Sequence, residues 1–300
     1  CSPPMKATIY ALAAIALWAS LAALALSLSH VPAFLLTGVS LMVGSVLAWP
    51  AVLRRPALWR MPPSTLAFGV LSLFGYHFLL FMGLRLAPAV EVNLINYLWP
   101  LLLVVLAPLY LPGMSLRPVH LMASAMGFGG AIIAIMGAQT SASTTSSHPL
   151  LGYLLALLAA CAWANYSLQT KRLSLQGRGF PTAAIGLFGL VSGGFSLLCH
   201  WALEPAVSLS LQDWGLLVLL GLGPLGASFF LWDQALKLGD ARHIGILSYI
   251  TPLASTTLLL VASARPLTLS IAGAAALIMG AAVLGTRSRS SGTEGWEPRS

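Results

Sequence analysis

A short polar and aromatic segment interrupts an otherwise apolar stretch in the first half of the chain. It reads EVNLINYLWP, from Glu91 to Pro100. Asn93, Asn96, Tyr97 and Pro100 are spaced at i, i+3, i+4 and i+7, so on a continuous helix they form one stripe. Asparagine is costly in lipid and should face the interior of a bundle. Each asparagine could contact a ligand or make a plain interhelical hydrogen bond.

The same segment has a counterpart in the second half of the chain. GLRLAPAVEVNLINYLWPL, which begins at residue 83, aligns with ALKLGDARHIGILSYITPL, which begins at residue 235, a shift of 235 − 83 = 152 residues. Tyr97 then pairs with Tyr249, and Pro100 pairs with Pro252. Such self-similarity indicates an internal repeat.

The composition places the chain in a membrane. Of its 300 residues, 58% are hydrophobic and only 7% are charged, and the mean hydropathy is +0.89. This is too little charge to cover a water-soluble surface. The apolar runs exceed ~18 residues and do not alternate, so they predict spanning helices and not a barrel. The lipid bilayer is therefore an expected partner.

Several function classes are disfavoured. The net charge of +8 comes from cations scattered over short loops, without a basic stripe, so no nucleic-acid partner is expected. The three cysteines have neither CxxC nor His-paired spacing, so we expect no disulfide framework, no metal site and no cofactor. No spanning segment contains HExxH, GxSxG or a carboxylate pair, so we expect no catalytic residues and no enzyme.

Apolar runs between Pro, Gly and charged residues predict an all-α integral membrane protein with ten transmembrane helices. Residues 1–138 form the first five-helix repeat, 139–149 an extracytoplasmic linker, 150–286 the second repeat and 287–300 a disordered cytoplasmic tail. The predicted helices are Ala7–Ser27, Pro32–Leu53, Ser64–Leu84, Ala89–Tyr110, Pro118–Ala138, Leu150–Thr170, Pro181–Leu203, Gln212–Leu236, Ala241–Ser263 and Pro266–Gly285.

The distribution of positive charge supports this count. With both termini cytoplasmic, 13 of the 15 Lys and Arg residues lie inside, and only Arg85 and Arg265 lie outside. Five helices per repeat is an odd number, so the two repeats enter the membrane from opposite sides. Inverted repeats are the architecture of secondary transporters that work by alternating access.

The paired prolines predict hinges. At 1.5 Å per residue, Pro100 lies roughly 16 Å along its helix from Ala89. Pro252 lies about as far from the start of its own helix, so both fall near the midplane of a ~30 Å hydrocarbon layer. Each proline frees a carbonyl one turn earlier, that of Asn96 or Ser248. Either a packing kink shared by the repeats or a functional hinge explains this.

Deep aromatic residues predict a cavity lined by rings. Trp18, Trp99 and Trp163 are expected well inside their helices and not at the interface, where tryptophan usually collects. Aromatic faces suit a flat ring or a cation. Tyr97 and Tyr249 approach from opposite sides and could flank such a ligand, although ordinary packing explains these two tyrosines as well.

Two further helices carry candidate polar contacts. Tyr76 and His77 are consecutive, so at least one should face the interior. His77 could serve as a proton-linked gate or donor, or as a satisfied core histidine. Tyr166 and Gln169 are spaced at i and i+3 on another helix and give a second polar face.

Acidic residues are placed shallowly. Asp233 is the deepest, and Lys237 at i+4 offers it a partner near the cytoplasmic end. A deep carboxylate would be the natural counter-ion for a cation or a proton relay. Its absence favours a neutral or zwitterionic ligand.

The motifs KATIYALAAIALWASL, EVNLINYLWPLL, AWANYSLQTKR and LSYITPLAS resemble those of the drug/metabolite transporter superfamily. More narrowly they resemble its aromatic amino acid exporters of the YddG type, over essentially all of Lys6 to Thr286. The resemblance implies ten helices, a central cavity and export of aromatic amino acids. The positions that it maps onto are Trp18, Tyr76, Asn96, Tyr97, Trp99, Pro100, Trp163, Tyr166, Ser248, Tyr249 and Pro252.

The leading hypothesis is a secondary transporter that exports neutral, mainly aromatic amino acids across a bacterial inner membrane. The alternative is a broader metabolite or drug exporter, including toxic cations, on the same fold. The expected binding residues are those of the resemblance together with His77, with Pro100 and Pro252 as hinges. The small-molecule substrate is the main partner, and a monomer is expected.

Overall fold

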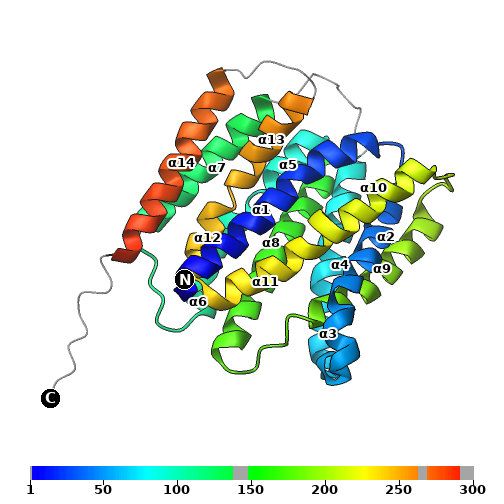
Figure 1. Ribbon diagram of the computed structural model, residues 1–300. Helices are drawn as coiled ribbons and strands as arrows, with labels where there is room; N and C mark the ends of the chain where they lie inside the picture. Colours follow the sequence, from blue (N-terminus) through cyan, green and yellow to red (C-terminus); the bar gives the residue numbers. More distant parts are fainter. Residues whose placement is uncertain (1, 138–147, 263–268, 291–300) are drawn as a thin grey trace.

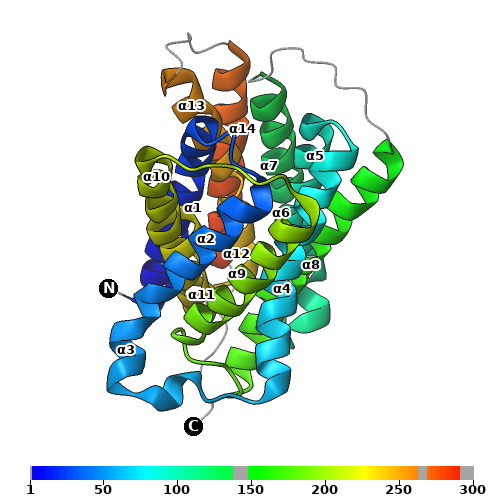
Figure 2. The ribbon, with the colours of Figure 1, turned by 90° about the vertical axis from the view of Figure 1, so that its right-hand side faces the viewer.

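Helices make up all the regular structure in the part of the chain that the computed structural model describes, residues 2–137, 148–262 and 269–290. They form a bundle whose members run roughly up and down in Figures 1 and 2. The elements are α1 (Pro3–Ser27), α2 (Ala33–Ser45), η1 (Val46–Ala48), α3 (Trp49–Arg54), η2 (Pro56–Trp59), α4 (Pro63–Leu86), α5 (Ala89–Asn96), α6 (Trp99–Tyr110), α7 (Pro118–Gly137), α8 (Pro149–Leu175), α9 (Ala184–Leu203), α10 (Leu211–Leu222), η3 (Gly223–Ala227), α11 (Ser228–Leu238), α12 (Ala241–Leu247), α13 (Ile250–Ala262) and α14 (Leu269–Ser290).

Seven helical segments within the described residues are long and apolar enough to cross a membrane. Two shorter apolar helices, Pro118–Ile133 and Leu269–Leu284, accompany them. The all-helical class predicted from composition is thus confirmed. The seven segments are Pro3–Leu21, Ala33–Arg54, Pro63–Leu86, Glu91–Tyr110, Pro149–Leu175, Ala184–Leu203 and Leu211–Leu238.

Two predicted helices are interrupted halfway. The predicted Ala89–Tyr110 helix breaks at Tyr97 and Leu98, between α5 and α6. The predicted Ala241–Ser263 helix breaks at residues 248–249, between α12 and α13. Each break falls two to four residues before a proline, which lacks an N–H and crowds the preceding turn. The continuous stripe expected from Asn93 to Pro100 is therefore wrong, because its two ends lie on different helices.

The predicted Gln212–Leu236 helix is also irregular. Residues Gly223–Ala227 form a π-helical turn that contains Pro224, and the hydroxyl of Ser228 donates to the Pro224 carbonyl at 2.5 Å. The proline removes one backbone donor, and the Ser228 hydroxyl adds a side-chain hydrogen bond within the turn. Such π-helical turns often occur at functional sites.

One end of the bundle, which we call the lower end, holds the start of α1 and is the lower part of Figures 1 and 2. Long-range contacts tie its segments together. Trp59 Nε1 donates to the Ala183 carbonyl at 2.8 Å, and Arg242 Nη1 donates to the Ser115 carbonyl at 2.7 Å. A Cβ on Gly239 would lie 2.8 Å from the Cβ of Ala7 near the start of α1.

The opposite end, the upper end, joins the other helix termini. Glu204, after α9, accepts from the backbone N–H of Phe34 at 3.0 Å and so caps the start of α2. Arg85 near the end of α4 donates to the carbonyl of Leu203. His148 N–H donates to the carbonyl of Leu86 at 3.4 Å. It follows that α1, α4 and α9 run upward, while α2 and α8 run downward.

The helices pack in related pairs. α2 lies against α9 and α7 against α14, while α4 packs on α8 and α1 packs on α11. Small residues bring backbones close together, as they do at membrane helix contacts. A Cβ on Gly44 of α2, for example, would lie only 2.7 Å from the Gly221 carbonyl oxygen of α10.

The predicted linker and the predicted C-terminal tail lie largely outside the described residues. Most of the predicted linker 139–149 lies outside the described residues, as does most of the tail. The helix α14 continues to Ser290, so the prediction of a disordered tail from residue 287 is wrong for its first residues.

Candidate substrate-binding cavity

A cavity of about 380 Å³ lies in the upper half of the bundle. Leu28, Ser29 and Val31 line its upper part, next to the connection between α1 and α2. Its deep part reaches Trp99 and Trp163. A volume of this size suits one small organic molecule.

Seven of the ten residues predicted to bind substrate line this one cavity. They come from α1, α4, α8 and both sides of the break between α5 and α6, so the fold gathers residues from distant parts of the chain. The seven are Trp18, Tyr76, His77, Asn96, Tyr97, Trp99 and Trp163.

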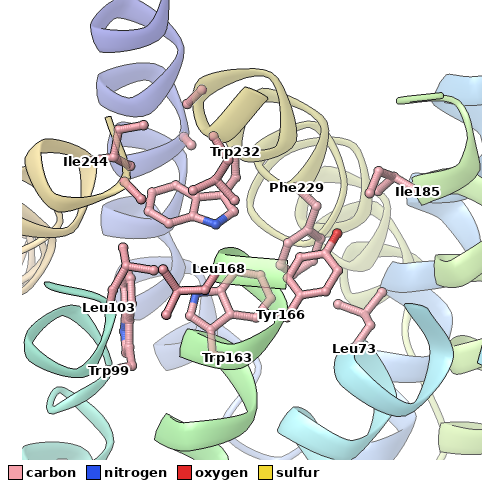
Figure 3. Close-up of a cluster of buried hydrophobic side chains, with 14 of the residues drawn as sticks. Leu73, Trp99, Leu103, Trp163, Tyr166, Leu168, Ile185, Phe229, Trp232 and Ile244 are labelled. Atoms are coloured by element: carbon pink, nitrogen blue, oxygen red, sulfur yellow. The ribbon is translucent and has the colours of Figure 1, made fainter. Parts of the chain in front are cut away.

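Aromatic rings converge at the deep end of the cavity. Trp163 is 3% exposed, and its ring centroid lies 5.4 Å from that of Tyr76 and 6.0 Å from that of Trp18. Figure 3 shows Trp163 of α8 beside Trp99 of α6 and Trp232 of α11, so that the three indole rings face one another. Offset and edge contacts of this kind hold the rings in fixed orientations.

Trp232 closes the aromatic cluster on its lower side. Its ring lies 5.2 Å from Trp18 and 5.5 Å from Trp99, and its Nε1 donates to the hydroxyl of Ser167 at 3.1 Å. The side chain is fully buried. We refer to Trp18, Trp99, Trp163 and Trp232 as the tryptophan floor.

Uncharged polar atoms supply the remaining recognition. Asn96 donates through Nδ2 to the Tyr76 hydroxyl at 3.2 Å, while its Oδ1 is buried without a partner. Thr37 and Thr251 also line the cavity, and their buried hydroxyl oxygens lack hydrogen-bond partners. Among the described lining residues, none is Asp, Glu, Lys or Arg. Buried polar atoms without partners are rare in folded proteins.

His77 lies on the cavity wall but is held by its own helix. It is 5% exposed, and its Nδ1 lies 2.7 Å from the carbonyl of Leu73. A carbonyl only accepts, so Nδ1 carries the hydrogen and Nε2 remains as the other polar atom. The ring also packs edge-on against Phe229 at 6.2 Å.

The other three predicted binding residues do not line this cavity. Tyr166 stacks behind Trp163 at 5.3 Å. The Ser248 hydroxyl donates to the Ile244 carbonyl at 2.8 Å within its own helix turn. Tyr249 is fully buried against α7, where a Cβ on Gly127 would collide with its ring. Tyr97 lines the cavity and Tyr249 does not, so the two rings do not face one another across this cavity.

Comparison with known proteins places the chain. The model of the EamA-like transporter family matches residues 5–136 and again residues 150–286. The chain belongs to the EamA-like transporter family. The resemblance to drug/metabolite transporters is thereby confirmed, and the chain is a multi-pass membrane protein. The two separate matches coincide with the two repeats inferred from sequence.

Named relatives of this EamA-like transporter are similar over almost their whole length. A protein of Ancylobacter novellus, named aromatic amino acid exporter YddG, is 38% identical over 284 residues, which cover 94% of this chain and 97% of that protein. A protein of Escherichia coli with the same name is 26% identical and covers 93% and 96%. A solved crystal structure matches with a TM-score of 0.85 at 37% identity and covers 94% of this chain and 97% of that one.

Several lining residues of the EamA-like transporter were missed by the sequence analysis. Phe229 and Thr251 are the repeat partners of His77 and Trp99, because 77 + 152 = 229 and 99 + 152 = 251. Thr251 already lies in the aligned segment opposite Trp99, and extending the alignment would have found Phe229. Apolar lining residues such as Leu36 carry no comparable signal.

Below the tryptophan floor lies a second polar cluster. Asp233 Oδ2 accepts from Lys237 Nζ at 2.6 Å and from the Thr182 hydroxyl at 2.6 Å. The pairing of Asp233 with Lys237 agrees with the prediction. The Thr182 contact, which joins α11 to the residues just before α9, was not predicted.

Proposed function

We propose that this EamA-like transporter exports neutral, mainly aromatic amino acids. The observation that carries the proposal is a single cavity with an aromatic deep end and an uncharged polar wall. A planar side chain can stack against the tryptophan floor. The Asn96 oxygen and the threonine hydroxyls can bind the charged groups of a zwitterion, whose net charge is zero. The names of the relatives in two bacteria support the same substrate class.

The proposal includes ten spans arranged as two inverted five-helix repeats. Each interrupted helix then counts as one span, as α5 with α6 and α12 with α13. The opposite directions of α1 and α8, the first helices of the two repeats, support the inversion. The helix pairing agrees with this arrangement. Because α4 corresponds to α11 and α8 corresponds to α1 in the two repeats, the contact of α4 with α8 has its equivalent in the contact of α11 with α1.

The proposed orientation puts the lower end in the cytoplasm of a bacterial inner membrane. Lys6, Arg60, Arg117, Arg178 and Arg242 lie at or beside the lower end, as the positive-inside rule requires. The cavity then faces outward, and transport needs an alternate state that is open below. The breaks before Pro100 and Pro252 are the proposed hinges. One chain supplies the whole cavity, so a monomer suffices.

Counterflow into proteoliposomes tests the function. Phenylalanine is expected to exchange, while threonine and a quaternary amine exchange far more slowly. Trp99→Leu should abolish exchange of phenylalanine. Trp201→Leu is the matched control, because Trp201 is 85% exposed on α9. Exchange of threonine without phenylalanine would refute the proposal, and equal exchange of the quaternary amine would favour the broader drug exporter.

A further inference from the structure

The polar cluster below the tryptophan floor has the composition of a binding site. We propose that Asp233 and Lys237 bind the ammonium and carboxylate groups of a zwitterionic amino acid when the lower half of the bundle opens. This proposal rests on the export function above. It assigns the lower half a charged loading site, whereas the described lining of the upper cavity is uncharged.

The cluster is closed by contacts that an incoming ligand could replace. Lys237 Nζ donates to Asp233 Oδ2 at 2.6 Å and to the carbonyl of Phe180 at 2.8 Å. Thr182 donates to the same carboxylate oxygen. Lys171 Nζ donates to the Lys237 carbonyl at 3.1 Å and so ties α8 to the end of α11. Thr182 and Phe180 belong to the segment before α9, so the proposed opening would separate this segment from α11.

One carboxylate oxygen of Asp233 accepts no hydrogen bond from the protein. Asp233 is fully buried, and its Oδ1 has no hydrogen-bond partner. A buried ionised oxygen without a donor is costly, and native structures rarely keep one without a reason. A ligand ammonium group would supply the missing donor, and Lys237 could then turn to the ligand carboxylate. Such charge-assisted hydrogen bonds are the strong ones in proteins.

The repeat shows which face of α11 a lower cavity would use. Tyr76, His77, Leu80 and Phe81 of α4 all line the upper cavity. A shift of 152 residues maps these four onto a set on α11 that begins with Ser228 and Phe229 and ends with Trp232 and Asp233. In an inverted repeat, the equivalent face lines the cavity that opens on the opposite side. Asp233 is thus the lower-side equivalent of a cavity-lining phenylalanine, since 81 + 152 = 233.

The arrangement predicts how the ligand lies. With its charged groups at Asp233 and Lys237, an aromatic amino acid would direct its ring upward to Trp232, whose ring already contacts the other three tryptophans of the floor. The ligand would then pass from the lower cluster to the upper cavity by moving across the plane of Trp232. The lower site therefore reads both charges of the head group, and analogues that lack one charge should bind it poorly.

Competition from each side of the membrane tests the site. Phenylalanine transport is measured in vesicles of both orientations, in the presence of 2-phenylethylamine, which lacks the carboxylate, or 3-phenylpropionate, which lacks the ammonium group. From the lower side, both analogues should compete about tenfold or more weakly than phenylalanine. In Asp233→Asn, the ratio of the apparent affinities for phenylalanine and 3-phenylpropionate should fall about tenfold. In Lys237→Met, the ratio of the apparent affinities for phenylalanine and 2-phenylethylamine should fall about tenfold.

The two variants should each affect a different analogue, and this distinguishes a binding site from an ion pair that only holds the closed structure together, here called a latch. A latch would change the apparent affinity for all three compounds equally, or from both sides equally, and either result would overturn the proposal. Asp213→Asn, at the upper end, is the matched carboxylate control and should leave the lower-side ratios unchanged. Thermal unfolding in detergent checks the fold, and Lys237→Met decides alone if Asp233→Asn does not fold. A wild-type protein that does not transport phenylalanine would refute the proposed function instead.

Discussion

The unpartnered oxygen of Asn96 offers the sharpest test of ligand recognition in the upper cavity. Asn96 is 6% exposed, its Nδ2 is occupied by the Tyr76 hydroxyl, and its Oδ1 faces no protein donor. A ligand ammonium group is a suitable donor. Asn96→Leu keeps the approximate volume of the side chain and removes this acceptor.

The size of the effect follows from the type of hydrogen bond. A bond to a charged group contributes about 1.5–3 kcal/mol, which corresponds to roughly a 10- to 150-fold weaker dissociation constant for phenylalanine. Tyr76→Phe removes only a neutral contact, worth about 0.5–1.5 kcal/mol, and keeps the Asn96 oxygen. It should therefore weaken binding by about tenfold at most. Calorimetric titration of the purified protein measures both.

The ligand without an ammonium group provides the internal control. Binding of 3-phenylpropionate should be nearly equal in the wild type and in Asn96→Leu. Asn165→Leu is the matched variant, because Asn165 accepts from the Tyr110 hydroxyl at 2.8 Å and does not line the cavity. The reasoning fails if Asn96→Leu binds phenylalanine within twofold of the wild type, or if it weakens both ligands by the same factor.

Three further substitutions test the scaffold by thermal denaturation. Gly127→Val would collide with the Tyr249 ring and should cost about 1–3 kcal/mol, whereas a change of the midpoint near zero would show that α7 can move aside. Glu204→Gln removes the charged cap of α2 and should cost about 0.5–2 kcal/mol, less at high salt. Burial alone would raise the pKa of Asp240, but its hydrogen bonds and ion pair with Arg242 outweigh burial and lower that pKa below its ordinary 3.8. The stabilisation by Asp240 should thus be present at neutral pH and be lost as the pH falls through the lowered pKa, and Asp240→Asn should lack this part of the pH dependence.

The sequence predicts the deep residues of the cavity well, because polar and aromatic side chains inside apolar helices have few other roles. Trp18, Tyr76, Asn96 and Trp163 were all found in this way, and all line the cavity. Apolar lining residues such as Leu80 were not found. In a helix that is apolar all round, hydropathy does not distinguish a cavity-facing leucine from a lipid-facing one.

The helix breaks explain most of the remaining differences. The prolines indicated irregular backbone, but the consequence for neighbouring side chains depends on where the helix resumes. Tyr97 stays on the cavity wall after the first break, whereas Tyr249 packs against Gly127 after the second. The repeat therefore predicts equivalent positions along the chain but not equivalent surroundings in one conformation. The alternating access proposed above requires the two halves to adopt different states at any moment, and it accounts for this inequality.

Access to the two halves of the bundle should differ in the same way. Ala33 lines the upper cavity, whereas Thr170 is 1% exposed in the lower half of α8. In a background without the native cysteines, Ala33→Cys should react quickly with an impermeant maleimide applied from the upper side. Thr170→Cys should react only through the alternate state, with the same reagent applied from the lower side. A minor state populated at 0.1–10% predicts labelling about 10- to 1,000-fold slower, and phenylalanine should accelerate it by driving the exchange of states. Equal rates at the two positions would mean that the lower half is already open. This result would contradict the closed polar cluster that Asp233 forms with Lys237 and Thr182.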